Sequence, residues 1–366
     1  MVKSHLVYFL MFTMLSISCK KTVVVEKIVE VEKKYAWTEI KDLSLSFSNR
    51  IQLNSILIKD SIVGFINNEG LFAVNANTLK YNSNLGGLYG FGTSTIGEKP
   101  TATNEILVSA YRSYAKAVSV ANPILSDGSA PINPAYNNDS TFLEFQKPYI
   151  SNISPQAIVK NRFILLPFLS KLSSLQKQFA YLVIISPKPS GGLKTDSTRT
   201  LQFNALSAMF ESGIYYINSF NDRFFTSYGD DFYRVDTSGN IKSFGAPMYS
   251  ISGMFKLSGN LFAVNPNGRI YISSDNGENW SLFTTLDSIW GFIRFQQIGD
   301  EAFAIYRDQI WQLIFEGNTL TIKELVNEGM ERTVITSIIK CSDKVFVTTK
   351  YGVYYRQWDK FKEFKK

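Results

Sequence analysis

Histidine is almost absent from this chain, since the single one is His5 and none follows it. Catalysis by Ser-His-Asp or Cys-His groups requires an imidazole, and so does a histidine-ligated metal site. Cysteine is nearly as rare, with only Cys19 and Cys341. These absences exclude histidine-dependent catalysis from the body of the chain, and we expect no cofactor and no metal.

The chain also lacks a dense block of basic residues. It carries 38 Lys and Arg against 31 Asp and Glu, a formal net charge of +7. The nearest basic group is Lys360, Lys362, Lys365 and Lys366, which we expect to be a solvated tail. Because proteins that track nucleic-acid phosphates need clustered cations, we expect no nucleic-acid partner.

The N-terminus has the pattern of an export signal. Lys3 precedes an apolar run over residues 6–15, and small residues follow up to Ser18. The run is too short to span a bilayer, so residues 1–18 are expected to be a secretory signal peptide. With Cys19 at the cut, the segment resembles a bacterial lipoprotein signal, although the commonest form has Leu where Ser16 stands. This resemblance implies that Cys19 is lipidated and anchors the protein, and we expect the outer membrane.

Residues 20–34 read KKTVVVEKIVEVEKK and cannot build a core alone. Together with Cys19 they form a tether region over residues 19–36. Val24, Ile28, Val31 and Tyr35 follow heptad spacing, so a short coiled coil is the alternative to a simple tether. We expect a monomer. With Cys19 lipidated, Cys341 is the remaining thiol, so no intrachain disulfide forms and Cys341 is expected to be buried.

The rest of the chain consists of repeats. A polar residue leads into a β-rich run seven times, starting at Asp60, Asn104, Asn161, Asp222, Asn260, Asp300 and Asp343. Each unit contains further β-rich runs. One follows the run just named, and one precedes it, such as IWGFIRF from Ile289. A fourth run closes the unit, and residues 361–364 are the expected fourth run of the last unit. Four short antiparallel strands with a period near 40 are typical of propeller blades. The sequence therefore predicts an all-β fold over residues 37–366, a seven-bladed β-propeller of four-stranded antiparallel blades.

The strand expected at residues 37–40 has two possible places. It could pair with the last blade and close the ring, or it could be an additional edge, because the last unit already has four β-rich runs.

Residues 273–280 read SSDNGENW and match the pattern S-x-D-x-G-x-x-W, between the expected third and fourth strands of one unit. Asp275 can accept turn amide hydrogens, Gly277 can adopt a positive φ, and Trp280 can cap the hairpin. Through this motif the chain resembles the Asp-box, or BNR-repeat, sialidase-like β-propeller family. The resemblance implies structural roles for Ser273, Asp275, Gly277 and Trp280, with residues 236–239 as a decayed copy. It does not extend to sialidase activity, because the chain has no Arg-Ile-Pro segment.

Four short segments, at residues 60–62, 139–141, 196–198 and 287–289, begin with Asp followed by Ser. They resemble O-glycosylation acceptors of exported proteins of the Bacteroidetes type. With the lipoprotein signal, this resemblance indicates an envelope lipoprotein of that type.

Two units are lengthened, by residues 122–155 and 186–200. Loops on a rigid scaffold are frequent binding sites, which makes these insertions candidates. Their candidate binding residues are Tyr136, Phe142, Phe145 and Tyr149 as aromatic anchors, with Lys188 and Lys194 at a polar rim. The alternative is that the aromatic side chains only pin the segment to its blade.

The function that these features favour is a non-enzymatic, lipid-anchored envelope propeller that binds a protein or glycan partner. The alternative is a carbohydrate-active hydrolase or lyase that uses Asp, Glu and Tyr of an axial pocket.

Replacing Cys19 by Ala tests the anchor. We expect Cys19→Ala to abolish metabolic lipid labelling and to release the protein from the membrane fraction, because no thiol is left to acylate. Labelling with a clickable fatty acid, followed by detergent partitioning, measures both effects. Unchanged partitioning of the variant would contradict lipid anchoring.

Overall fold

The computed structural model describes residues 36–41, 52–59, 61–67, 71–81, 101–102, 107–111, 118–121, 130–132, 142–145, 157–160, 162–172, 177–189, 193–204, 214–228, 231–245, 248 and 250–366. Contacts divide the chain into a unit Met1–Lys34 and a unit Tyr35–Lys366. The predictions for the signal peptide, Cys19 and the tether lie outside the described residues. Everything below concerns the second unit.

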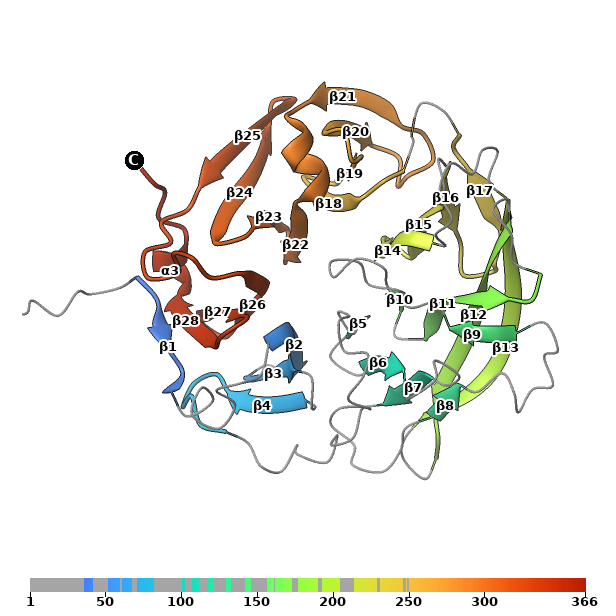
Figure 1. Ribbon diagram of the computed structural model, residues 1–366, viewed down its shortest axis with the longest axis horizontal. Helices are drawn as coiled ribbons and strands as arrows, with labels where there is room; N and C mark the ends of the chain where they lie inside the picture. The colour runs from blue at the N-terminus through green and yellow to red at the C-terminus, as the bar shows by residue number, and fades with distance from the viewer. Residues whose placement is uncertain are drawn as a thin grey trace, which may run out of the picture. The chain divides into compact units, whose positions relative to one another are not determined.

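The described strands form seven antiparallel sheets, each made mainly of consecutive strands (Figure 1). The first sheet contains β2 (Gln52–Lys59), β3 (Ile62–Asn67) and β4 (Leu71–Asn75). The second contains β5 (Thr101–Ala102), β6 (Leu107–Tyr111), β7 (Val118–Ala121) and β8 (Ala130–Ile132). The third contains β10 (Ala157–Val159), β11 (Phe163–Ser170), β12 (Lys177–Pro187) and β13 (Leu193–Asn204), with β9 (Phe142–Phe145) paired to β11.

The C-terminal half contains the other four sheets. The fourth sheet contains β14 (Ile214–Phe220), β15 (Arg223–Tyr228), β16 (Asp231–Val235) and β17 (Ile241–Ser243). The fifth contains β18 (Gly253–Leu257), β19 (Asn260–Val264), β20 (Arg269–Ser273) and β21 (Ser281–Thr285). The sixth contains β22 (Arg294–Ile298), β23 (Glu301–Tyr306), β24 (Gln309–Glu316) and β25 (Thr319–Glu324). The seventh contains β26 (Ile335–Cys341), β27 (Lys344–Thr349), β28 (Val353–Gln357) and β1 (Thr38–Glu39).

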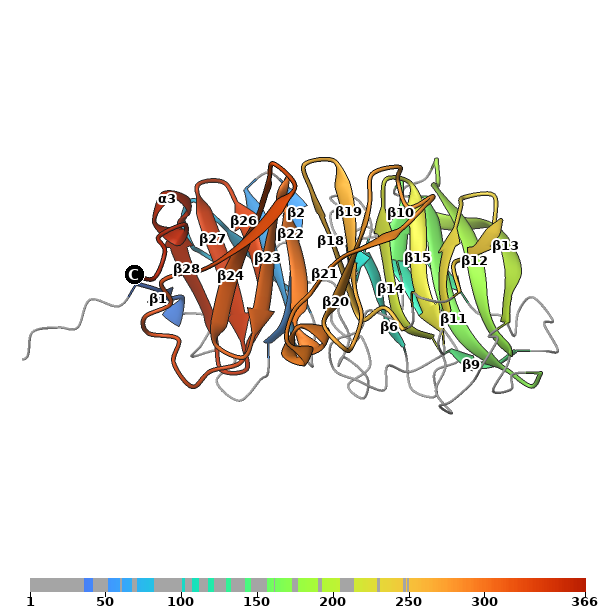
Figure 2. The same cartoon turned by 90° about the horizontal axis from the view of Figure 1, so that it is seen from above.

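Neighbouring sheets pack through their first strands, which we call the inner strands: β2, β5, β10, β14, β18, β22 and β26 (Figures 1 and 2). From the second sheet onward, each sheet contacts the next one along the chain, and β2 of the first sheet contacts β26 and β27 of the seventh. A single antiparallel sheet of this size has two apolar faces to bury, and a neighbour on each side buries them.

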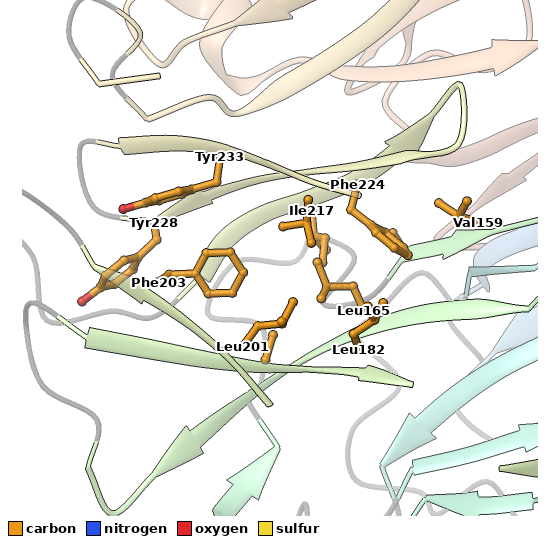
Figure 3. Close-up of a cluster of buried hydrophobic side chains, with 12 residues drawn as sticks. Val159, Leu165, Leu182, Leu201, Phe203, Ile217, Phe224, Tyr228 and Tyr233 are labelled. Carbon is orange, nitrogen blue, oxygen red and sulfur yellow. The ribbon is translucent and has the colours of Figure 1, made fainter. Parts of the chain in front are cut away.

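The contact between the third and fourth sheets shows how the faces are buried (Figure 3). Leu165, Leu182 and Phe203 of the third sheet point toward Ile217 and Phe224 of the fourth, and all five are at most 3% exposed. Such side chains alternate along their strands with residues of the opposite face, as the two-residue period of a β-strand requires. Burial of this kind is the main force that holds one sheet against the next.

Most of the β-rich runs are strands at the expected positions, and two expectations are wrong. The run from Ile289 begins as a 3₁₀ helix, η3 (Ser288–Phe292), and β22 starts only at Arg294. The helix forms because the Trp290 N–H bonds the Asp287 carbonyl at 3.0 Å and Gly291 lies directly against the Pro266 backbone, where a Cβ would come within 2.2 Å. Residues 361–364 are not the outer strand of the last sheet; Phe361 ends the short helix α3 (Trp358–Phe361).

The N-terminal strand β1 occupies the outer position of the seventh sheet. It pairs with β28, with Thr38 opposite Tyr355 and Glu39 opposite Tyr354. Of the two alternatives for residues 37–40, the structure therefore has the pairing with the last sheet. Trp37 fixes this strand, because its ring packs against Phe361 at 5.8 Å and is 5% exposed.

The basic C-terminal residues include Lys360 and Lys365, each with a side chain 63% exposed to solvent, but they are attached to the sixth sheet and do not form a free tail. Lys362 Nζ lies 2.8 Å from a Glu301 carboxylate oxygen, and Lys365 Nζ lies 2.9 Å from one of Glu324. Phe364 forms an antiparallel bridge with Leu325. The segment is attached because Phe361, at 1% exposed, is buried among the side chains of the sixth and seventh sheets.

Truncating Trp37 tests the closure by β1. We expect Trp37→Ala to lower the free energy of unfolding by about 3–5 kcal/mol, because a buried indole is lost. The hydrogen bond of 2.7 Å from Trp37 Nε1 to Asn327 Oδ1 is lost as well. Chemical denaturation measures the change, with Tyr351→Ala, at a 69% exposed position, as the control. A loss no larger than in the control would show that β1 does not hold the last sheet.

Candidate functional site

The hairpin between β20 and β21 is held by one carboxylate. Asp275 Oδ1 accepts the N–H groups of Glu278 at 3.1 Å and Asn279 at 2.9 Å, and Asp275 Oδ2 accepts the Asn279 side-chain amide at 2.8 Å. Ser273 Oγ donates to Asp275 Oδ1 and accepts the Gly277 N–H, both at 2.8 Å. Ser273 and Asp275 thus stabilise their own turn.

These hydrogen bonds lower the pKa of Asp275 to about 2. The largest cause is the backbone N–H of Asn279, followed by its side-chain amide, because both stabilise the charged carboxylate. Asp275 therefore remains ionised throughout the physiological range.

Trp280 joins the fifth sheet to the fourth. Its ring meets Phe225, Phe232 and Phe244 edge-on, with centroid distances of 6.2, 5.7 and 6.5 Å. Gly277, at φ +77°, approaches Phe225 so closely that an added Cβ would lie 2.5 Å from the ring. The hairpin thus covers the neighbouring sheet, and Trp280 packs on a cluster to which both sheets contribute.

Cations of the fourth sheet reach the same hairpin. The Arg234 guanidinium pairs with the Glu278 carboxylate, and Lys242 Nζ donates to the Glu278 carbonyl at 2.6 Å. The hydrogen bond from Arg234 is the largest cause of the lowered pKa of Glu278. Arg234 is 13% exposed and Glu278 45%, so the pair is partly screened by water.

A second hairpin, between β16 and β17, repeats the hydrogen bonds that the carboxylate of Asp275 forms in the first one. Asp236 Oδ1 accepts the N–H groups of Ser238 at 2.8 Å and Asn240 at 2.9 Å, and its Oδ2 accepts the Asn240 amide at 2.8 Å. Arg199 of the third sheet donates to the Ser238 carbonyl. The decayed copy therefore keeps its carboxylate function, and the shared spacing of Asp and Asn four residues apart was the signal that the sequence analysis missed.

Beside the Asp275 hairpin, two adjoining hollows form one open groove between β21 and β25, which we call the β21–β25 groove. The hollows measure about 560 and 570 Å³ and share Ile272, Ser281 and Asn318. The apolar end is lined by Leu282, Phe283, Leu286, Leu320 and Ile322. The polar end is lined by Asn260, Ser274, Asp275, Asn279, Trp280 and Phe315. No sequence motif indicated this groove, because its walls belong to two different sheets.

Polar side chains of the inner strand β22 form hydrogen bonds with the inner strands on both sides. Arg294 donates to the carbonyls of Thr336 at 2.7 Å and Ile335 at 2.6 Å on β26. On the other side, Gln297 Oε1 accepts the Lys256 N–H of β18 at 3.1 Å, and Gln297 Nε2 donates to the Lys256 carbonyl at the same distance. Burial lowers the pKa of Arg294 to about 10. These polar side chains therefore satisfy backbone groups of the adjacent inner strands.

Carboxylates are absent from the inner strands within their described bounds: none of β2, β5, β10, β14, β18, β22 and β26 contains Asp or Glu. No three His, Cys, Asp or Glu side chains gather as a metal site in the part of the chain that the structure describes. Cys341 is 2% exposed, so its expected burial is confirmed.

None of the described candidate residues of the two lengthened units lines the groove. Tyr136 and Tyr149 lie outside the described residues, and Phe145 lies on β9 opposite Phe168 of β11. Phe142 packs against Phe168 at 5.6 Å and Tyr181 at 6.1 Å. This contact agrees with the alternative that aromatic side chains pin the segment to its blade.

The second lengthened segment, residues 186–200, extends the hairpin β12–β13. Lys188 follows the end of β12 and is exposed. Lys194 lies on β13 and pairs with Asp196 at 3.4 Å.

No protein-family model matches the chain, and a search of curated proteins gives no match. Among solved structures, the chain is similar to a catalytically inactive virginiamycin B lyase from Staphylococcus aureus with quinupristin (10% identity, TM-score 0.54, 88% of this chain and 98% of that one). It is also similar to the extracellular domain of a hybrid two component system from B. thetaiotaomicron, with 11% identity and a TM-score of 0.53. This match covers 89% of this chain and 40% of the other. A third similar structure is that of PorZ, a surface component of the type-IX secretion system of Porphyromonas gingivalis, with 11% identity and a TM-score of 0.49. This match covers 87% of this chain and 38% of the other.

These bacterial proteins are β-propeller-like, and the fold of this chain is propeller-like as well. At such identities the likeness concerns the fold alone. The chain spans about two fifths of the length of the B. thetaiotaomicron and P. gingivalis proteins. Among the described residues, no helix is long and apolar enough to cross a bilayer.

Acid titration tests the role of Asp275. Its folded pKa of about 2 lies below the usual 3.8, so its contribution to stability is present above pH 4 and is lost as the pH falls toward 2. We expect Asp275→Asn to lower the melting temperature at pH 7 and to flatten its fall between pH 4 and 2. Scanning calorimetry across this range measures both, and parallel curves for the two proteins would contradict the assignment.

Proposed function

We propose that this chain is a lipid-anchored, seven-bladed β-propeller of the bacterial cell envelope that binds a protein or glycan partner without catalysing a reaction. The observation that carries the proposal is the β21–β25 groove. It is open, it lies between two strands at the outer edges of their sheets, and it displays Leu282 with 56% of its surface exposed. Exposed apolar surface beside a hollow is typical of binding sites.

The order of the sheets supports seven blades. The described strands form seven sheets; from the second onward each contacts the next along the chain, and the first contacts the seventh. The pairing of β1 with β28 combines an N-terminal and a C-terminal strand in one sheet, which is how many propellers close their ring.

Two features support an anchored envelope protein. The N-terminal pattern ends in Cys19, a position that a lipoprotein would acylate. The similar solved structures include bacterial surface and extracellular domains. The outer membrane remains our proposed location.

The alternative is a carbohydrate-active hydrolase or lyase with an axial site. A glycoside hydrolase typically needs two converging carboxylates, and the described parts of the inner strands contain neither Asp nor Glu. The polar side chains of β22 are occupied by backbone groups of β18 and β26. The likeness to a lyase is a likeness of fold, so binding is the function that we propose.

The aromatic residues of segment 122–155 remain a second predicted binding surface. Because β8 and β9 lie within this segment, it contributes strands to the second and third sheets as well.

A charge at Leu282 tests the proposal. We expect Leu282→Glu to reduce capture of a partner at least about tenfold, because the carboxylate must be desolvated in an apolar contact. Stability should change little, since the side chain is mostly exposed. The measurement is capture from solubilised envelopes by the immobilised full-length protein, with protein and carbohydrate both assayed.

Tyr351→Glu is the matched control, because Tyr351 is 69% exposed and lies outside the groove. Capture that is equal for the wild type, the control and Leu282→Glu would refute the groove as the binding site.

A further inference from the structure

We infer that the polar end of the β21–β25 groove binds a neutral oligosaccharide. This inference rests on the proposed function and names the class of ligand. Its basis is the lining of this end, which combines amide and hydroxyl side chains with two aromatic rings. The volume of about 570 Å³ falls in the range of small-ligand sites.

The hydrogen-bonding groups are already oriented. The Asn279 amide N–H donates to Asp275 at 2.8 Å, and that of Asn260 donates to the Ser258 carbonyl at 3.2 Å. These two hydrogen bonds hold the side chains of Asn260 and Asn279 in place. Within the described part of the chain their Oδ1 atoms accept no hydrogen bond, so these atoms are available as acceptors. Sugar hydroxyls are donors and acceptors at once and match fixed amides of this kind.

Asn318 completes the polar end from the sixth sheet. Gly317 and Asn318 form the β24–β25 turn with φ values of 55° and 65°, a conformation of tight hairpins that favours these residue types. The Asn318 side chain is exposed and lines both hollows. Its amide makes no hydrogen bond to any described residue and can therefore both donate and accept.

The apolar surface suits the C–H face of a sugar ring. Phe315 lines the groove and is braced by Phe262 at 5.1 Å and Phe283 at 5.8 Å, both in edge contacts. Trp280 lines the same end and is fixed against the fourth sheet. Rigid aromatic surfaces beside oriented polar groups bind amphipathic ligands at low entropic cost.

The charge of the lining selects a neutral ligand. Asp275 is its only charged residue, and no Lys or Arg lines either hollow. Because the pKa of Asp275 is about 2, the groove carries a negative charge at neutral pH. Because the lining offers an anionic glycan or a phosphate no cationic partner, Asp275 disfavours such ligands there.

The test uses the full-length protein in detergent on an array of neutral and anionic glycans, followed by calorimetric titration with the neutral oligosaccharide that binds best. We expect neutral glycans alone to be retained. Asn318→Gly keeps the turn conformation and removes the amide, and it should weaken the affinity about tenfold. Asn267→Ala, an exposed amide in the β19–β20 turn outside the groove, should leave the affinity unchanged.

Retention of no neutral glycan, preferential retention of anionic glycans, or equal affinity of Asn318→Gly and the wild type would each overturn the inference. If no glycan binds while Leu282→Glu still abolishes capture of an envelope protein, the groove is a protein site. In that case the inference fails and the proposed function stands.

Discussion

The unpaired edges of short sheets are the constraint on which this fold depends. An inner strand has hydrogen-bonding groups on its free edge that no strand satisfies, and buried groups of this kind are costly. On β26 and β18, side chains of the adjacent sixth sheet provide the missing partners. Arg294 bonds two carbonyls of β26, and Gln297 bonds both backbone groups of Lys256 on β18. The sixth sheet therefore stabilises the edges of both its neighbours.

The outer hairpins couple the sheets by a different means. Asp275 and Asp236 fix the shape of their turns, and basic side chains of the preceding sheet bond the turns so presented. Trp280 adds apolar packing between the same two sheets, because its ring contacts Phe232. The motif residues thus serve the interface between two sheets, which explains why a turn contains both a buried serine and a tryptophan.

Strands were predictable where a turn residue precedes a β-rich run, as at β15, β19, β23 and β27, because that pattern is local. The errors arose where distant contacts decide the structure. Gly291 fits against Pro266 and permits a helical turn in a run that reads as a strand, and Phe361 is buried by residues of other sheets. The turn residues around Asp275 were foreseeable, whereas the groove was not, since Asn318 belongs to another sheet.

The groove is a consequence of the hairpin that borders it. Trp280 packs against three aromatic rings of the fourth sheet, and on its other side Ile272 and Ser281 line a hollow next to the sixth sheet. On the sixth sheet, the C-terminal segment covers only the end of β25, where Phe364 bridges Leu325 and Lys365 bonds Glu324. The beginning of β25 therefore stays open opposite the hairpin. The same side chain that closes one interface leaves the next one accessible, so the most conspicuous structural motif of the chain also forms one wall of its candidate binding site.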